Sequence, residues 1–275
     1  MNHIVAGAIA STRDVCEARR RSSVTHGARY LLAGAFCAMS VLPATLFAQD
    51  EAPRRAELTA DIGYVNTSGN TSVTSLNLGN KLILRAGAVL LTQTSAFVYG
   101  RTSGEETANN QALRVRADRP IGNRLAVYGF GGYDRNKFGG VARRFDQNVG
   151  LTYDVLQASR DSIGFEAGIG LVQESLYADE GGILRNANNY SAGRAAANYK
   201  HAFTETSYFQ QTLEYLPDLE ESSAYRLNSE SSVVAPVSTH IGLKASALIR
   251  YNNAPPLPEF RKTDRLISAG LQLTF

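Results

Sequence analysis

The feature that most constrains the fold is a two-residue alternation of apolar and polar side chains, which recurs along the chain after Glu57. The last nine residues, "ISAGLQLTF", carry apolar side chains at every second position up to Phe275, with Ser, Gly, Gln and Thr between them. Successive side chains of a strand point to opposite faces, so this pattern predicts a strand with one apolar and one polar face. About twelve such stretches follow one another without a convincing amphipathic helix, which predicts an all-β fold.

The connections between the predicted strands alternate in length. The connections "AG", "PIGN", "ASRD", "TET" and "PVST" are short, whereas "TSGEETANN", "KFGGVARR", "ADEGGILRNANN", "PDLEESSA" and "NNAPPLPEFRK" are longer and richer in charge, Gly or Pro. "NTSGNT" is the one short member of the long set. Short turns at one end and long loops at the other are typical of an up-and-down barrel whose ends meet different compartments. Every proline after residue 48 lies in a connection or at a strand end, as a continuous sheet requires.

Tyrosines recur near one end of the predicted strands. A tyrosine ring favours hydrocarbon and its hydroxyl favours water, so a ring of tyrosines at one height indicates a membrane interface. Strands favour tyrosine in soluble proteins as well. Recurrence at one end favours the membrane interpretation, and we expect a transmembrane antiparallel up-and-down β-barrel of about 12 strands. The tyrosines near the long-loop ends are Tyr64, Tyr99, Tyr133, Tyr177, Tyr215 and Tyr251.

The first 48 residues have a different character. A basic region between Arg19 and Arg29 precedes the apolar run "LLAGAFCAMSVLPATLF", after which the chain becomes polar. This layout is typical of a secretory signal peptide, cleaved after Ala48. A membrane-spanning helix is disfavoured because the run is only about 17 residues long and contains Pro43. We therefore predict a signal peptide at 1–48, a short periplasmic segment at 49–56 and, at 57–275, a barrel located in the cell outer membrane.

Removal of the signal peptide changes the charge and the cysteine count. It takes away five of the 28 basic and two of the 25 acidic residues, so 23 of each sign remain. This balance argues against a nucleic-acid partner. Both cysteines, Cys16 and Cys37, lie in the removed segment, so we expect no disulfide and no thiolate metal site in the exported chain, and no cofactor is predicted.

Charged side chains lie at the alternate strand positions that carry the other polar residues. Because charges facing lipid are costly, we expect them to face the lumen. Two readings stay open: a wetted lumen that conducts small solutes, with Arg114 and Arg116 facing carboxylates, or a salt-bridge network that fills a barrel of intermediate width. The near balance of signs favours a narrow or closed lumen. The predicted lumen-facing charges are Arg114, Arg116, Asp118, Asp146, Asp154, Glu166, Arg194, Lys244 and Arg250, together with Asp61, Lys81, Lys200, Arg226 and Glu230.

Basic residues also lie in or beside the long loops. Arg143, Arg144, Arg261 and Lys262 are candidates for contacts with lipopolysaccharide, because guanidinium groups bind phosphates in a bidentate manner. A solvated loop is the alternative interpretation.

Evidence for catalysis is weak. His201 and His240 both lie at predicted short turns without a plausible serine partner, and the acidic pairs of the long loops have no histidine nearby to act as base. Calcium binding by Asp179 and Glu180 lacks any loop signature. We therefore predict that the protein is not an enzyme, with an outer-membrane hydrolase as the alternative.

The segment "GYVNTSGN" followed by an alternating strand, the segment "FGGYDRNKFGG" and the terminal strand resemble the domain of unknown function 481 family, often labelled salt-induced outer membrane protein. The resemblance covers residues 57–275. It implies an outer-membrane barrel of Gram-negative type and supplies no catalytic residues. The terminal alternation through Leu271, Leu273 and Phe275 also resembles the signal that the barrel assembly machinery reads, which implies that machinery as a partner during biogenesis.

These observations predict an outer-membrane β-barrel that acts either as a porin-like small-solute channel or in the envelope response to stress, the latter suggested only by the family label. A soluble periplasmic β protein is the remaining structural alternative, because strand periodicity alone does not exclude a sandwich.

Overall fold

The computed structural model describes residues 55–67, 73–177, 188–255 and 261–275. The predicted signal peptide lies outside these residues, as do Asp179 and Glu180. Within the described ranges, no helix is long and apolar enough to cross a membrane. The one helical element there is a 3-10 turn, η2 (Lys137–Gly139).

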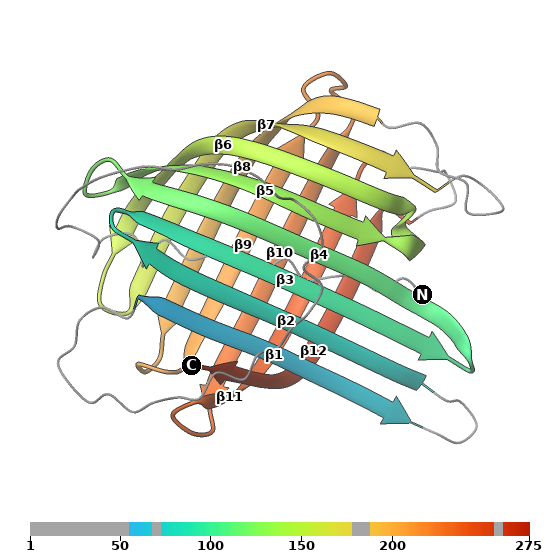
Figure 1. Ribbon diagram of the computed structural model, residues 1–275, viewed down its shortest axis with the longest axis horizontal. Coiled ribbons are helices and arrows are strands. Elements are labelled where there is room, and N and C mark those ends of the chain that lie inside the picture. Colours follow the sequence, from blue (N-terminus) through green and yellow to red (C-terminus); the bar gives the residue numbers. More distant parts are fainter. Residues whose placement is uncertain (1–54, 68–72, 178–187, 256–260) are drawn as a thin grey trace, which may run out of the picture.

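Twelve antiparallel strands form a single closed barrel in which each strand pairs with its neighbours in the chain and β1 pairs with β12 (Figure 1). This confirms the predicted all-β, up-and-down barrel. The strands are β1 (Ala56–Thr67), β2 (Val73–Ala86), β3 (Val89–Thr102), β4 (Glu105–Pro120), β5 (Leu125–Asn136), β6 (Val141–Gln157), β7 (Asp161–Leu176), β8 (Asn188–Ala202), β9 (Tyr208–Pro217), β10 (Tyr225–Pro236), β11 (Ile241–Asn252) and β12 (Thr263–Thr274).

Two connections predicted to be long loops are tight turns, so that prediction was wrong. β3 and β4 are joined by Ser103 and Gly104 alone, and both residues have positive φ, 52° and 89°. Two consecutive positive-φ residues match the twist of the flanking strands in a hairpin. β5 and β6 are joined through η2, where the Asn136 side chain accepts a hydrogen bond from the Gly139 amide at 2.8 Å. The ladder continues through polar residues because backbone hydrogen bonds, and not side-chain hydrophobicity, define the strand.

Apolar side chains of alternate positions lie on the outside of the barrel. Ile267 is 86% exposed, Ile169 64% and Val149 61%. Polar side chains of the opposite parity are buried inside, among them Thr152, Glu166 and Arg194. This is the reverse of a soluble protein, in which the buried face is the apolar one.

The interior contains two small apolar clusters. Val98, Ala108, Leu248 and Leu266 form one, which joins β3 and β4 to β11 and β12. Ile83, Leu90 and Ala126 form the other, at the end of the barrel that carries the short turns. Outside these clusters the described interior is largely polar, with Tyr128, Phe130, Val172 and Val234 among its buried apolar side chains.

The strands β1 and β12 close the barrel through the shortest ladder in the described chain. It contains four partner pairs, from Thr59 with Thr274 to Ile62 with Leu271. Beyond this ladder, Leu58 and Phe275 exchange backbone hydrogen bonds of 3.2 and 2.9 Å. A Cβ atom at Gly270 would overlap the carbonyl oxygen of Ile62 and lie 3.1 Å from Gly63 Cα, so a glycine is needed where the two backbones approach.

Candidate functional site: a charged network in the lumen

A network of buried ion pairs crosses the lumen, with Arg194 of β8 and Glu166 of β7 at its centre. Arg194 Nη1 donates to Glu166 Oε2 at 2.5 Å and Arg194 Nε to Glu214 Oε1 of β9 at 2.7 Å. The side chains of Arg194 and Glu166 are both 0% exposed. Buried charges of this kind are tolerated only when they are paired and hydrogen-bonded.

Arg116 of β4 extends the network from the other side of Glu166. Its Nη1 donates to Glu166 Oε2 at 2.8 Å, and its Nε lies 3.0 and 2.9 Å from the two carboxylate oxygens of Asp118. Arg116 and Asp118 are two residues apart on one strand, so both point inward. Its Nη2 donates to Thr152 Oγ1 at 3.2 Å. One carboxylate, Glu166, is therefore shared by arginines from β4 and β8.

The ring of Tyr128 on β5 packs beneath both arginines. Its hydroxyl donates to Asn148 Oδ1 at 2.8 Å and accepts from Arg194 Nη1 at 3.0 Å. The guanidinium carbon of Arg116 lies 4.2 Å from the ring centroid, within cation–π range. A Cβ atom at Gly168 would overlap the Tyr128 hydroxyl and the Asn148 side chain, so the absent side chain makes room for this packing.

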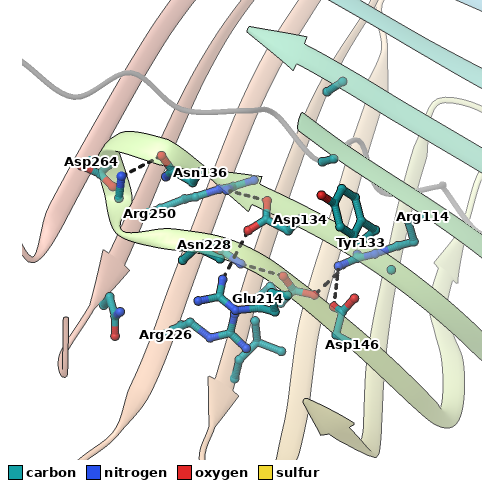
Figure 2. Close-up of a pocket in the computed structure, with 18 of the residues that line it drawn as sticks. Arg114, Tyr133, Asp134, Asn136, Asp146, Glu214, Arg226, Asn228, Arg250 and Asp264 are labelled. Atoms are coloured by element: carbon teal, nitrogen blue, oxygen red, sulfur yellow. Dashed lines mark hydrogen bonds and ion pairs between the residues drawn. The ribbon is translucent and has the colours of Figure 1, made fainter. Parts of the chain in front are cut away.

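A cavity of about 150 Å³ lies on the long-loop side of the network, and we call it the long-loop cavity (Figure 2). Arg114 of β4 reaches across it, 3.5 Å from Asp146 and 3.9 Å from Glu214. Asp134 of β5 and Arg250 of β11 approach to 3.9 Å, although these strands are six positions apart around the twelve-stranded barrel. Side chains from opposite walls therefore meet at this level, and the lumen is narrow.

A larger cavity of about 530 Å³, the short-turn cavity, lies at the other end of the lumen. Lys244 and Asp61 form an ion pair of 2.6 Å on its wall. Lys200 Nζ lies 4.3 Å from the ring centroid of Tyr208. Glu230 also lines this cavity, so both signs of charge are present.

A third space of about 90 Å³, the middle cavity, lies beside the network along β10 to β12 and β1 to β3. Small residues line it, including Gly63, Gly79, Ser246 and Ser268. It shares Ser95 and Ala96 with the long-loop cavity. It shares four residues with the short-turn cavity, namely Asp61, Lys81, Glu230 and Lys244. The three cavities thus adjoin one another in series past the buried network.

The structure places the sequence-predicted lumen residues at different heights. Arg116, Asp118, Glu166 and Arg194 meet in the central network, whereas Arg114, Asp146 and Arg250 line the long-loop cavity. Lys244 lies apart from them in the short-turn cavity. Asp154 lies near the short turns, where it accepts a hydrogen bond from Gln157 at 2.6 Å.

The four basic residues predicted to contact lipopolysaccharide do not form one surface. Arg143 is exposed on the outside, but Arg144 points into the lumen, with ion pairs of 2.8 Å to Glu174 and 3.3 Å to Asp134. Adjacent residues of a strand must face opposite ways, so the two arginines cannot act together there. Arg261 and Lys262 line the long-loop cavity. Leu271 and Phe275 are exposed at the barrel exterior, while recognition of Leu271, Leu273 and Phe275 by an assembly machinery stays a prediction.

Sequence reasoning did not single out Tyr128, Asn148 or Glu214 as site residues. Glu214 and Thr212 lie two positions apart in the stretch "SYFQQTLEYL", on the same polar face of the strand. This pattern could have identified Glu214 as an inward-facing residue. Tyr128 is 1% exposed inside the lumen and shares its parity with Phe130. Aromatic rings on the inward face hide the binary pattern, so alternation could not assign them.

The described residues offer little for catalysis or metal binding. No group of three His, Cys, Asp or Glu among them could hold a metal ion. His201 pairs with Asp161 at 2.8 Å, and Asp161 also accepts a hydrogen bond from the hydroxyl of Tyr199 at 3.0 Å. The absence of an enzymatic role stays a prediction.

Fold and site together define a closed, twelve-stranded antiparallel barrel with an apolar exterior and a charged interior. The chain belongs to the family described as "Protein of unknown function, DUF481", whose model matches residues 60–275. No curated protein matches the sequence.

Several solved structures are similar to the chain at low sequence identity. The translocator domain of autotransporter NalP from Neisseria meningitidis is 11% identical with a TM-score of 0.46, and the alignment covers 82% of this chain and 90% of that one. The NanC porin is 10% identical with a TM-score of 0.43, covering 78% and 97%. An anion-selective porin from Comamonas acidovorans is 8% identical with a TM-score of 0.38, covering 80% and 98%.

Proposed function

We propose that the protein is an outer-membrane barrel that acts as a restricted channel for small solutes. The exposed apolar band suits contact with lipid, where a spanning sheet has to close on itself because no water is present to satisfy its edges. If the barrel were in water and not in a membrane, exposed isoleucines such as Ile267, which is 86% exposed, would form an extensive apolar surface.

The observation that carries the proposed channel is the series of three adjoining cavities beside the ion-pair network. The network fills the half of the lumen bounded by β4 to β9, so the remaining route runs eccentrically along the small residues of the middle cavity. At about 90 Å³ this cavity has the smallest volume of the three, and we take it as the constriction of the route. A constriction of this kind passes small solutes and rejects large ones.

The apolar cluster of Val98, Ala108, Leu248 and Leu266 lies beside the middle cavity, and both Val98 and Leu266 line it. Apolar constrictions conduct poorly because water and ions enter them reluctantly. We therefore expect a small unit conductance in place of the large current of a wide porin.

Conductance of the folded protein in a planar bilayer tests the proposal. We expect small, discrete current steps from the unmodified protein and their loss in Ser246→Phe, which places an aromatic ring in the middle cavity. Ala245→Phe is the matched control, because Ala245 is the adjacent residue and faces outward. A silent bilayer with folded protein, shown by a heat-dependent gel shift, would overturn the channel proposal. Equal currents in the two variants would place the route elsewhere.

A further inference from the structure

The long-loop cavity carries an excess of positive charge. Among the described residues, six basic and four acidic side chains line it. The basic ones are Arg114, Arg144, Arg226, Arg250, Arg261 and Lys262. This differs from the short-turn cavity, where lysines and carboxylates are mixed.

Three of the four carboxylates that line the long-loop cavity have an arginine partner, and the fourth, Asp264, has no cation within 4.0 Å among the described residues. Glu214 accepts hydrogen bonds from Arg194 at 2.7 Å and Asn228 at 2.8 Å. Asp134 accepts one from Arg144 at 3.3 Å, and Asp146 lies 3.5 Å from Arg114. The negative charge of these three carboxylates is therefore offset by their partners.

Three cations are left over. In the part of the chain that the structure describes, no carboxylate lies within 4.0 Å of Arg226, Arg261 or Lys262. Lys262 Nζ donates to Asn253 Oδ1, a neutral partner, at 3.3 Å. Arg226 of β10 lines both the long-loop cavity and an adjoining cavity of about 160 Å³, which also contains Tyr190 and Asp218.

Arg226 is held on a strand and not on a loop. It lies opposite Leu216 of β9 and Asn252 of β11 in the ladder, so its backbone is fixed on both sides. Figure 2 shows it on the wall of the cavity near Asn228 and Glu214. The backbone of Arg226 is thus ordered before an anion binds, and the planar guanidinium fork loses less conformational freedom per hydrogen bond than a lysine ammonium group does.

We propose that the long-loop cavity is a binding site for a small anion that bears a carboxylate or phosphate group, held by Arg226 with Arg261 and Lys262. The guanidinium fork donates two parallel hydrogen bonds to either group. The volume of about 150 Å³ limits the ligand to a small molecule. The inference concerns the folded barrel alone and does not require that the barrel conduct.

Calorimetric titration of the refolded protein in detergent free of lipopolysaccharide tests the site. The probes are sodium phosphate and succinate, with neutral succinamide as the control ligand, and the titrations are carried out at low ionic strength. We expect both anions to bind and succinamide not to bind. Equal binding of succinamide, or no binding of either anion, would overturn the proposal.

Variants locate the bound anion. Arg226→Gln is expected to raise the Kd at least about tenfold, because charge-assisted hydrogen bonds are lost. The double variant Arg261→Gln, Lys262→Gln should also raise the Kd. Both positions are exposed, so folding is least affected there. Arg101→Gln is the matched control, since Arg101 is exposed on β3 and donates to the Gly104 carbonyl outside the cavity. An equal rise of the Kd in Arg101→Gln, or an unchanged Kd in both cavity variants, would contradict the assignment.

Lipopolysaccharide also carries phosphate groups, so it is titrated in a separate experiment. We expect free phosphate to bind in its absence, with an affinity that falls as salt is added. Binding of lipopolysaccharide alone, with none of free phosphate or succinate, would place the contacts on the outer surface and overturn the cavity site. Because these titrations are made in micelles, their result is independent of the conductance measurement.

Discussion

Lys244 on β11 donates a hydrogen bond from Nζ to Oδ2 of Asp61 on β1, at 2.6 Å, and the pair spans the strand β12 that lies between them. Gln272 of β12 donates to the other oxygen of Asp61 at 3.0 Å. In the described residues, the β1 and β12 ladder has four partner pairs, whereas the β11 and β12 ladder has eleven. Three side chains thus hold the barrel together where its backbone ladder is shortest.

Replacement of Lys244 by methionine should weaken this closure. The lysine and aspartate side chains are 19% and 31% exposed, so the ion pair is only partly screened by water. We expect Lys244→Met to lower the free energy of unfolding by about 1–3 kcal/mol, because Asp61 is left without its cation. Urea titration in micelles, followed by circular dichroism because the chain contains no tryptophan, measures the change.

Lys137→Met is the matched control for that variant. Lys137 pairs with Glu106 at 2.5 Å, but the two side chains are 44% and 25% exposed at the long-loop end. Exposed pairs contribute about 0–1 kcal/mol. If Lys137→Met lowered the free energy of unfolding as much as Lys244→Met does, the ion pair at the β1 and β12 closure would have no special role in stability.

Gly270→Ala tests the backbone approach at the same closure. The added methyl group would overlap the carbonyl oxygen of Ile62, so β12 has to move away from β1. Overpacking of this kind costs about 1–3 kcal/mol. Gly131→Ala is the control, since a Cβ atom there has nothing within 4 Å. Equal unfolding midpoints for the two variants would show that the closure accommodates a side chain.

The alternation of apolar and polar side chains in the sequence predicted most of the barrel. The number of strands and their antiparallel order follow from the periodicity, because the pattern is repeated and the connections are short. The extent of β3 and β4 did not follow, since Glu105 and Asn109 look like loop residues although their backbone continues the ladder. A strand that extends past its apolar band is invisible to a pattern based on hydrophobicity.

The partners within the lumen were beyond the reach of the sequence. Parity shows that Arg194 faces inward, but it does not distinguish Glu166, which lies at contact distance, from Asp154, which lies near the short turns. Which inward residues meet depends on the stagger of the strands around the barrel, and this is a property of the closed sheet. The charged lumen could therefore be predicted as a set of residues and not as a network.

Tyr128→Phe removes one hydroxyl from the centre of the network. That hydroxyl donates to Asn148 and accepts from Arg194, so both partners lose a hydrogen bond inside the barrel. We expect the free energy of unfolding to fall by about 1–3 kcal/mol. In Tyr153→Phe the ring is 48% exposed on the outside, and the change should be within about 0.5 kcal/mol. Unfolding curves that coincide for both variants would mean that the Tyr128 hydroxyl is dispensable.

Arg114→Ala tests how the lumen charges act on permeating ions, and it rests on the proposed channel. Arg114 extends from β4 toward Asp146 and Glu214, and its loss leaves the neighbouring carboxylates with less positive charge beside the route. We expect a larger unit conductance and a shift of the reversal potential toward cation preference in a salt gradient.

Arg119→Ala is the matched control for ion selectivity, because it removes the same charge from an exposed position at the short-turn end of β4. Its reversal potential should stay at the value of the unmodified protein, since a charge outside the lumen is screened within about 10 Å at 0.1 M salt. A shift of equal size in both variants would assign the effect to net charge. An unchanged potential in Arg114→Ala would mean that ions do not pass Arg114 on their way through the barrel.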